Sequence, residues 1–243
     1  MKYANARRAF FELSRQVRGS EFIDLATIGH NGDRYKFFRI DIKPRKKLVK
    51  ICLAGAVHGD EIAGQKGLLK WISKPETIKK EAFYRLYPIV NPVGFEFWKR
   101  NNMRGFDLNR SFFAENAPTE IKVIRNDLKY QWFDAFISFH ENWAEDNEDL
   151  YIFYHPNRES RKLGRHIVKS MKGFAKIDKR KNIDSWKAEN GLIEADDDGS
   201  FEYFMGEKKA HASLCVEVPA RLSMKRRAMI VEKIIENAED YFY

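Results

Sequence analysis

The feature that most constrains the fold is an apolar run that ends in a histidine. Residues 48–57 are apolar apart from Lys50, and His58 and Glu61 follow at the start of a helical pattern over 61–73. An unbroken apolar run of this length is typical of a strand buried on both faces of a parallel sheet. Catalytic zinc binds imidazole nitrogen and carboxylate oxygen, so the His-x-x-Glu pair is a candidate for half of a zinc site.

Strand and helix patterns alternate along most of the chain. Strands are predicted at 22–29, 34–42, 48–57, 83–90, 135–140, 149–155 and 212–220. Helices are predicted at 4–18, 61–73, 119–132, 157–171 and 200–209, and after Ser223, which can cap a final helix. Asn31 and Gly32 predict a tight turn between the first two strands. This alternation predicts one α/β domain over residues 1–243, with a largely parallel central sheet and helices on both faces.

Two stretches have no regular period. Residues 91–112 are rich in Asn, Gly and Arg, and a long irregular segment inside a compact domain is usually functional. Residues 176–199 are polar and end in an acidic patch, and a further acidic loop is predicted at 141–149.

Composition narrows the class of protein. The chain has no signal peptide pattern and no apolar run that could span a bilayer, which predicts a cytoplasmic protein without membrane contact. Cys52 and Cys215 lie in apolar runs and are predicted to be buried, unpaired side chains. The net charge of +9 favours acidic ligands, but the basic clusters at 43–47, 176–181 and 225–227 are short. We therefore predict solvated basic faces and no nucleic-acid partner.

The remaining parts of a zinc site must come from later segments. Ligands in open α/β sheets gather at the carboxyl ends of strands. His140 ends the predicted buried strand at 135–140 and is the first candidate, with His155 at the end of the next strand as its rival. Glu217 is a charge inside an apolar strand, which is costly unless it is paired. It is either the partner of a buried arginine or a general base facing the metal.

Five blocks in order resemble the zinc metallocarboxypeptidase family M14. They are HGDE at 58–61, NPVGF at 91–95, RNNMRGFDLNR at 100–110, His140 and Glu217. The third block is the most specific, and the resemblance covers residues 48–220. It implies a three-layer α/β/α sandwich around a mixed, mostly parallel sheet, as in zinc carboxypeptidases, which have a phosphorylase/hydrolase-like fold.

The resemblance also implies a role for each matched residue. His58, Glu61 and His140 match the ligands of one zinc ion. Arg100 matches the arginine that steadies the oxyanion, and Glu217 matches the general acid/base.

Three further residues of the third block match positions outside the metal centre. Asn109 and Arg110 match the pair that grips the terminal carboxylate of the substrate. Asp107 matches an acid that orients a zinc-binding histidine.

The chain departs from the family pattern before the final strand. Many members carry a mobile tyrosine ahead of a Gly-Ser pair, and with that pair at 199–200 the position falls on Glu194. Phe201 falls near a specificity position and indicates an apolar side-chain pocket. The acidic run at 196–198 indicates a cationic substrate group instead, and the sequence does not choose between them.

Three functions are compatible with these residues. The first is a zinc carboxypeptidase of small peptides, for which cell-wall peptides are candidates because intracellular bacterial members of the family trim them. The second is a deacylase of N-acyl amino acids, of the related aspartoacylase and succinylglutamate desuccinylase group. That group shares an HGxE pair but typically carries a further C-terminal domain, whereas 218–243 holds about one helix. The third is an inactive relative that binds nucleic acid or anionic partners through its basic surface. The presence of every candidate metal ligand and of Glu217 argues against it.

Overall fold

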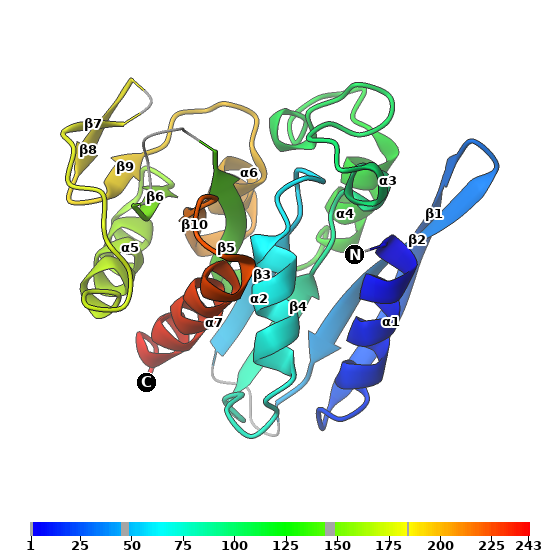
Figure 1. The fold of residues 1–243 in the computed structure, drawn as a ribbon, viewed down its shortest axis with the longest axis horizontal. Helices are drawn as coiled ribbons and strands as arrows, with labels where there is room; N and C mark the ends of the chain where they lie inside the picture. Colours follow the sequence, from blue (N-terminus) through cyan, green and yellow to red (C-terminus); the bar gives the residue numbers. More distant parts are fainter. Residues whose placement is uncertain (1, 45–48, 144–148, 184) are drawn as a thin grey trace.

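The computed structural model describes residues 2–44, 49–143, 149–183 and 185–243. Its described strands form one mixed sheet in the order β1-β2-β4-β3-β5-β10-β6-β9-β8-β7 (Figure 1). Their bounds are β1 (Ser20–His30), β2 (Asp33–Ile42), β3 (Val49–Gly55), β4 (Ala82–Tyr87), β5 (Phe133–Asn142), β6 (Tyr151–Tyr154), β7 (Asn182–Ile183), β8 (Trp186–Glu189), β9 (Leu192–Glu194) and β10 (Ala210–Pro219). The start of the predicted strand at residue 48 lies outside the described residues.

The mixed sheet that the resemblance implies is confirmed. The four central strands β4, β3, β5 and β10 run parallel, and β6 and β9 form one further parallel pair. Antiparallel pairs form both margins, including the β1–β2 hairpin and the β7–β8–β9 ribbon. Parallel pairing is therefore concentrated at the centre of the sheet, where the strands are buried on both faces.

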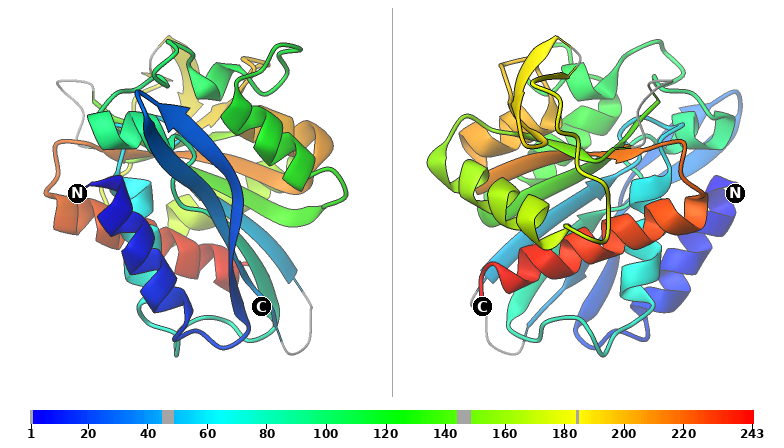
Figure 2. Two further views of the ribbon diagram at one scale, coloured as in Figure 1. Left: turned by 90° about the vertical axis from the view of Figure 1, so that its right-hand side faces the viewer. Right: turned by 60° about the vertical axis from the view of Figure 1, so that its left-hand side comes forward.

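Helices cover both faces of this sheet. Their bounds are α1 (Tyr3–Ser14), α2 (Ala63–Ile72), α3 (Pro92–Phe97), α4 (Thr119–Asp127), α5 (Arg158–Ser170), α6 (Phe201–Lys208) and α7 (Met224–Asp240), with a short 3-10 helix η1 (Leu108–Arg110). Helices α1, α2 and α7 lie on one face, with α5 packed beside α7, and α4 and α6 lie on the other (Figures 1 and 2). No helix in the described ranges is both long and apolar enough to cross a membrane.

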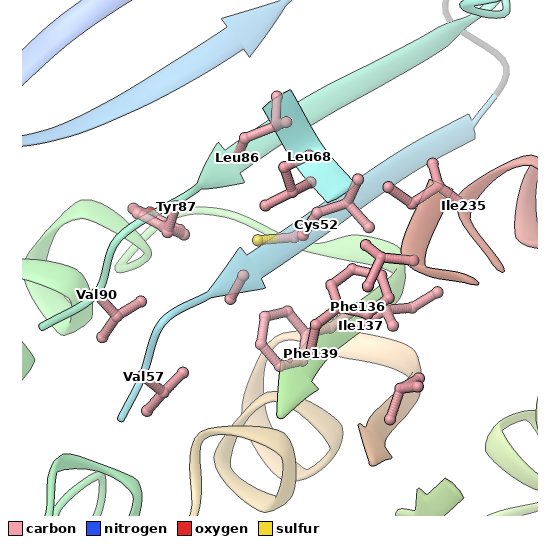
Figure 3. Packing of buried hydrophobic residues seen from close by; sticks show 14 of the residues in the cluster. Cys52, Val57, Leu68, Leu86, Tyr87, Val90, Phe136, Ile137, Phe139 and Ile235 are labelled. Carbon is pink, nitrogen blue, oxygen red and sulfur yellow. The ribbon is translucent and has the colours of Figure 1, made fainter. Parts of the chain in front are cut away.

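The core lies between two layers. One layer is β3 with its neighbouring strands, and the other is the helices that cover them. Figure 3 shows Cys52 of β3 and Leu86 of β4 close to Leu68 of α2. Gly67 allows α2 to approach α7, because a Cβ at this position would lie 2.2 Å from the side chain of Val231. Cys52 and Cys215 are both buried and unpaired, as predicted.

Local sequence signals set several boundaries correctly. Asn31 and Gly32 both have positive φ angles in the β1–β2 turn, which is the conformation that Asn-Gly hairpin turns adopt. Ser223 caps α7 by accepting a hydrogen bond from the Arg226 N–H group, and Ser200 caps α6 in the same way.

Other boundaries differ from the predictions. The irregular segment 91–112 contains α3 and η1, and the polar segment 176–199 contains β7, β8 and β9. Helix α4 ends at Asp127, five residues earlier than predicted, which leaves Trp132 half exposed. Glu141 and Asn142 belong to β5 and not to a loop, whereas residues 144–148 lie outside the described part of the chain. Short strands with polar side chains have no apolar run that would reveal them in sequence.

Candidate metal centre

Three neighbouring parallel strands bring the candidate chemical groups to one edge of the sheet. His58 follows the end of β3, His140 lies near the end of β5, and Glu217 lies on β10. Glu217 and His140 are direct partners in the β10–β5 register, so their side chains leave the sheet on the same face. This is the carboxyl-end position at which open α/β sheets place their sites.

The two histidines and Glu61 form a compact group. His58 Nδ1 lies 2.9 Å from Glu61 Oε1, and His140 Nδ1 lies 2.9 Å from Glu61 Oε2. The two Nδ1 atoms are 3.2 Å apart, and all three side chains are buried. The structure thus brings together the three residues that were predicted as metal ligands.

The outer nitrogen of each imidazole faces a carboxylate. His58 Nε2 donates to Asp107 Oδ1 at 3.2 Å, and His140 Nε2 donates to Glu202 Oε1 at 3.1 Å. A proton held on Nε2 leaves the Nδ1 lone pair free to point at the shared centre. A carboxylate behind each imidazole is the arrangement found at metal-binding histidines.

Charge is tightly balanced in this group. Burial opposes protonation of both imidazoles, but the Glu61 carboxylate, with Asp107 at one ring and Glu202 at the other, raises the pKa of His58 and of His140. Burial would also raise the pKa of Glu61, but the two imidazoles hold it well below its usual range. The site therefore favours a net positive charge between its ligand atoms, which a divalent cation can supply.

The donor set fits a zinc ion. Two imidazole nitrogens and one carboxylate make up the three protein ligands of many catalytic zinc sites, with a further position left open. A second group of ligand type, formed by His140, Glu202 and Cys215, shares His140 with the first. Its Glu202 carboxylate already accepts hydrogen bonds from Asn109 and Ser138, so the first group is the better metal site.

Arg100 lies in the long segment after α3 and reaches the group of His58, Glu61 and His140, which we call the metal group. Its guanidinium contacts Glu61 Oε1 at 3.1 Å and Asp107 Oδ2 at 3.3 Å. The Arg100 carbonyl accepts hydrogen bonds from the Gly59 N–H group and from the Asn91 side chain. The block that holds Asn91 therefore fixes Arg100 beside the turn that carries His58 and Glu61.

Asn109 and Arg110 lie on η1 and are held in different ways. The Asn109 side chain is buried, donating to Glu202 Oε2 at 3.1 Å and accepting from the Phe201 N–H group at 3.0 Å. Arg110 is half exposed and forms an ion pair with Asp198 Oδ2 at 3.1 Å. Asn109 is thus a structural link to α6, and Arg110 is the member of the pair that reaches open space.

A cavity of about 310 Å³ connects these groups. It is lined by the metal group together with Arg100, Arg110 and Glu217. Glu217 has no ion-pair partner within the described residues, which excludes the buried-arginine interpretation. Burial raises the pKa of Glu217 to about 7, with the His140 imidazole lowering it and the Glu61 carboxylate raising it. A carboxyl group with this pKa can both accept and donate a proton near neutral pH.

Three other predicted positions lie apart from the metal group. Phe201 is fully buried and stacks on Phe112 at 4.1 Å, so it belongs to the core and does not line the cavity. Glu194 accepts a hydrogen bond from the Tyr154 hydroxyl, outside the cavity wall. Neither side chain therefore lines the cavity, in contrast to the expectation from the sequence. His155 lines the cavity but is bound by Glu207 and Asn157, which leaves His140 as the candidate ligand.

Sequence reasoning missed several residues of this site. Glu202 directly follows Phe201 and, as an acidic residue in the first turn of α6, looks in sequence like an ordinary helix-start residue. The cavity also has an aromatic wall that the sequence scattered over a loop and two strands. Its members are Trp143, Tyr151, Phe153 and Trp186. Tyr203 lines the cavity too, nine residues after the position at which a tyrosine was sought.

Comparison with known proteins places this geometry in context. The profile of the succinylglutamate desuccinylase/aspartoacylase catalytic domain matches residues 47–238. Carboxypeptidase SOL1 of Arabidopsis thaliana is 32% identical over 51% of this chain and 30% of its own length. A probable aspartoacylase of Trichodesmium erythraeum is 27% identical over 46% of this chain and 42% of its own. The chain thus matches less than half the length of either relative.

Solved structures extend the likeness over nearly the whole chain. A candidate metallopeptidase from Shewanella amazonensis superposes with a TM-score of 0.82 at 21% identity, covering 99% of this chain and 92% of that one. At this identity the likeness establishes a shared fold.

Proposed function

Since this chain belongs to the succinylglutamate desuccinylase/aspartoacylase catalytic-domain family, we propose that it is a metallo-hydrolase of this M14-related group and, more specifically, a zinc-dependent carboxypeptidase. Its substrate would be a small peptide whose C-terminal amide bond is hydrolysed. The observation that carries the proposal is one cavity that holds a metal-ligand group, a carboxyl group with a pKa of about 7 and the half-exposed Arg110.

His58, Glu61 and His140 would hold the zinc ion. The chemistry that zinc supplies in such a site is Lewis acidity toward the scissile carbonyl and a lowered pKa for water. Asp107 and Glu202 keep both imidazoles in the tautomer that binds through Nδ1.

Glu217 would act as the general base and then as the general acid. It accepts a proton from the attacking water and donates it to the nitrogen of the leaving group, which departs as an amine. Arg100 would stabilise the negative charge that develops on the carbonyl oxygen, because its guanidinium lies beside Glu61 at the cavity. Arg110 would bind the terminal carboxylate through its planar fork.

Deacylation of N-acyl amino acids is the second candidate. The matching family profile and the aspartoacylase relative favour it. In both reactions the amine that leaves carries a free carboxylate, so Arg110 serves either one. The aromatic wall of the cavity favours peptides, because four aromatic side chains offer more apolar surface than a short acyl group needs.

The test compares wild type and Glu217→Gln, both loaded with zinc, on one substrate panel. The panel holds small peptides with free C-termini, the same peptides amidated at the C-terminus, cell-wall peptide fragments, N-acetylaspartate and succinylglutamate. We expect hydrolysis of peptides with a free C-terminus, which can include the cell-wall fragments, and no hydrolysis of the amidated peptides, N-acetylaspartate or succinylglutamate. Glu217→Gln should lose at least about a hundredfold in kcat while it retains its zinc.

Other outcomes decide against the proposal. Release of acetate or succinate without peptide cleavage would select the deacylase. Equal turnover by wild type and Glu217→Gln would overturn the role of Glu217.

A further inference from the structure

The arginine that would grip the substrate already holds a carboxylate of its own chain. Arg110 Nη1 lies 3.1 Å from Asp198 Oδ2 in an ion pair and donates a hydrogen bond to the Asn109 carbonyl at 2.9 Å. The Arg110 guanidinium is therefore already paired with a carboxylate of its own chain. Arg110 and Asp198 line the same cavity as Glu217 and the metal group, so an incoming carboxylate meets this ion pair.

The chain fixes Asp198 in this position through two backbone contacts. Asp198 Oδ1 accepts a hydrogen bond from the Ser200 N–H group at 3.0 Å, where Ser200 is the cap of α6. Gly199 has a φ of +75°, and a Cβ at this position would lie 2.8 Å from the Arg110 carbonyl oxygen. The Gly199 carbonyl also accepts from the Phe112 N–H group at 3.0 Å. The loop is thus seated directly on the Arg110 segment.

The ion pair is nevertheless exchangeable. The side chains of Arg110 and Asp198 are 49% and 35% exposed. Ion pairs of this exposure are weak, because water competes for both partners. A substrate carboxylate that is also anchored elsewhere in the cavity can therefore displace Asp198 Oδ2, whereas a small free anion gains less from doing so.

We propose that Asp198 is a specificity-determining residue that occupies the carboxylate position on Arg110 until a substrate carboxylate replaces it. The exchange raises the KM for substrates with a free terminal carboxylate. It also weakens inhibition by the carboxylate product, since Asp198 competes for Arg110 when the product leaves. The proposal rests on the proposed function in one respect only, namely that Arg110 binds the carboxylate of the ligand.

Asp198→Asn tests the effect of the Asp198 charge without removing the hydrogen bond that holds the loop. Asparagine keeps an Oδ1 acceptor for the Ser200 N–H group and removes the negative charge from Arg110. The matched control is Asp197→Asn, which removes the same charge from the adjacent residue. Asp197 accepts from the Gly199 N–H group, does not line the cavity and does not pair with Arg110 in the described structure.

Binding is measured by calorimetry on zinc-loaded protein in the Glu217→Gln background, so that no ligand is turned over. The probes are N-acetylphenylalanine and its C-terminal amide. We expect Asp198→Asn to bind the carboxylate about two- to fivefold more tightly and the amide unchanged, while Asp197→Asn resembles the parent for both probes. In the active background, Asp198→Asn should lower KM for free peptides by the same factor and leave kcat unchanged.

The remaining outcomes separate this inference from the proposed function. Loss of carboxylate binding in Arg110→Gln would show that Arg110 binds the carboxylate. If Asp198→Asn then binds the carboxylate no more tightly than the parent, the proposal that Asp198 competes for Arg110 is wrong. Weaker carboxylate binding by Asp198→Asn would mean that Asp198 positions Arg110, which also overturns the inference. If Arg110→Gln binds as the parent does, or no protein binds the probe, the carboxylate grip itself is wrong and the inference falls with it.

Discussion

At the scale of single residues, each imidazole of the metal group is oriented by a carboxylate from a distant part of the chain. Asp107 comes from the segment before η1, and Glu202 comes from the first turn of α6. Glu202 is the more enclosed of the two and also accepts from Asn109 and Ser138. Its hydrogen bond to His140 lowers the pKa of Glu202, so it stays a carboxylate despite its burial. It is therefore a positioning residue for the predicted ligand His140.

Glu202→Gln should weaken zinc binding by about 10- to 100-fold, because the amide is a poorer acceptor for the His140 Nε2–H group. The measurement is zinc affinity by competition with a chromophoric chelator. Glu207→Gln is the matched control, since Glu207 contacts His155 in the same way but outside the ligand group. Unchanged affinity in Glu202→Gln would remove Glu202 from the metal centre.

At the scale of elements, the turn after β3 is held by the block that begins α3. Ala56 adopts a positive φ of 47° where the chain leaves β3, and its carbonyl accepts from the Asn91 N–H group. Asn91 caps α3 through the Gly94 N–H group. Gly59 lies against this block so closely that a Cβ would fall 2.1 Å from the Gly94 carbonyl carbon. The conformation of the ligand turn thus depends on close backbone packing between two separate motifs.

Gly59→Ala should displace this turn, since the overlap is with backbone atoms that cannot rotate away. We expect a loss of about 1–3 kcal/mol in the free energy of unfolding, as for other overpacked sites, together with weaker zinc binding. Chemical denaturation with and without zinc measures both effects. Gly29→Ala is the control, because the nearest atom to its Cβ is 4.0 Å away. A Gly59→Ala protein that matches this control would show that the two motifs are not tightly coupled.

At the scale of the whole molecule, charged side chains from the C-terminal helix reach back to the sheet. Arg227 of α7 binds Glu141, whose carboxylate caps the start of α2 by accepting from the Ala63 N–H group. Glu239, near the other end of α7, accepts from the Tyr84 hydroxyl on β4. Burial raises the pKa of Glu239 to about 8, with the Tyr84 hydrogen bond lowering it. The final helix is thus fixed to the sheet at both of its ends.

Glu239 should make stability fall as pH rises. Its folded-state pKa of about 8 is above the usual value of 4.5, so the folded protein binds more protons than the unfolded chain between these values. Rising pH then costs up to about 1.4 kcal/mol per pH unit from this group. Glu239→Gln should flatten this decline, remaining close to wild type near pH 4 and more stable above pH 8.

Urea denaturation from pH 4 to pH 9 tests this expectation. The control is Glu12→Gln, because Glu12 is exposed on α1. Identical pH profiles for wild type and Glu239→Gln would show that Glu239 is not desolvated in the folded protein.

Acidic neighbours partly neutralise the basic clusters, while Lys43 and Lys176 stay largely exposed to solvent. Lys43 pairs with Glu21, Lys176 pairs with Asp149 and Arg227 pairs with Glu141, so each predicted basic cluster has a member in an ion pair. The rest of the first cluster, at 45–47, lies outside the described residues. The cytoplasmic location and the absence of a nucleic-acid partner stay predictions.

Much of this protein could be predicted from local sequence, because local patterns have local physical causes. Continuous apolar runs specify buried strands, and Ser and Asn at segment ends specify caps and turns. The short spacing of His58 and Glu61 on one turn, and the order of the motif blocks, were enough to predict that these two side chains and His140 lie together. Glu217 was found because a single charge in an apolar strand requires an explanation.

Only the tertiary structure decided which distant side chains meet. It brought His140 and not His155 beside Glu61, and it placed Phe201 in the core. It also put Glu202 behind the predicted ligand His140 and Asp198 on Arg110. These contacts depend on strand order and on how loops cross the edge of the sheet. Neither leaves a periodic pattern in the chain, because a contact between residues far apart in sequence is set by packing and not by spacing.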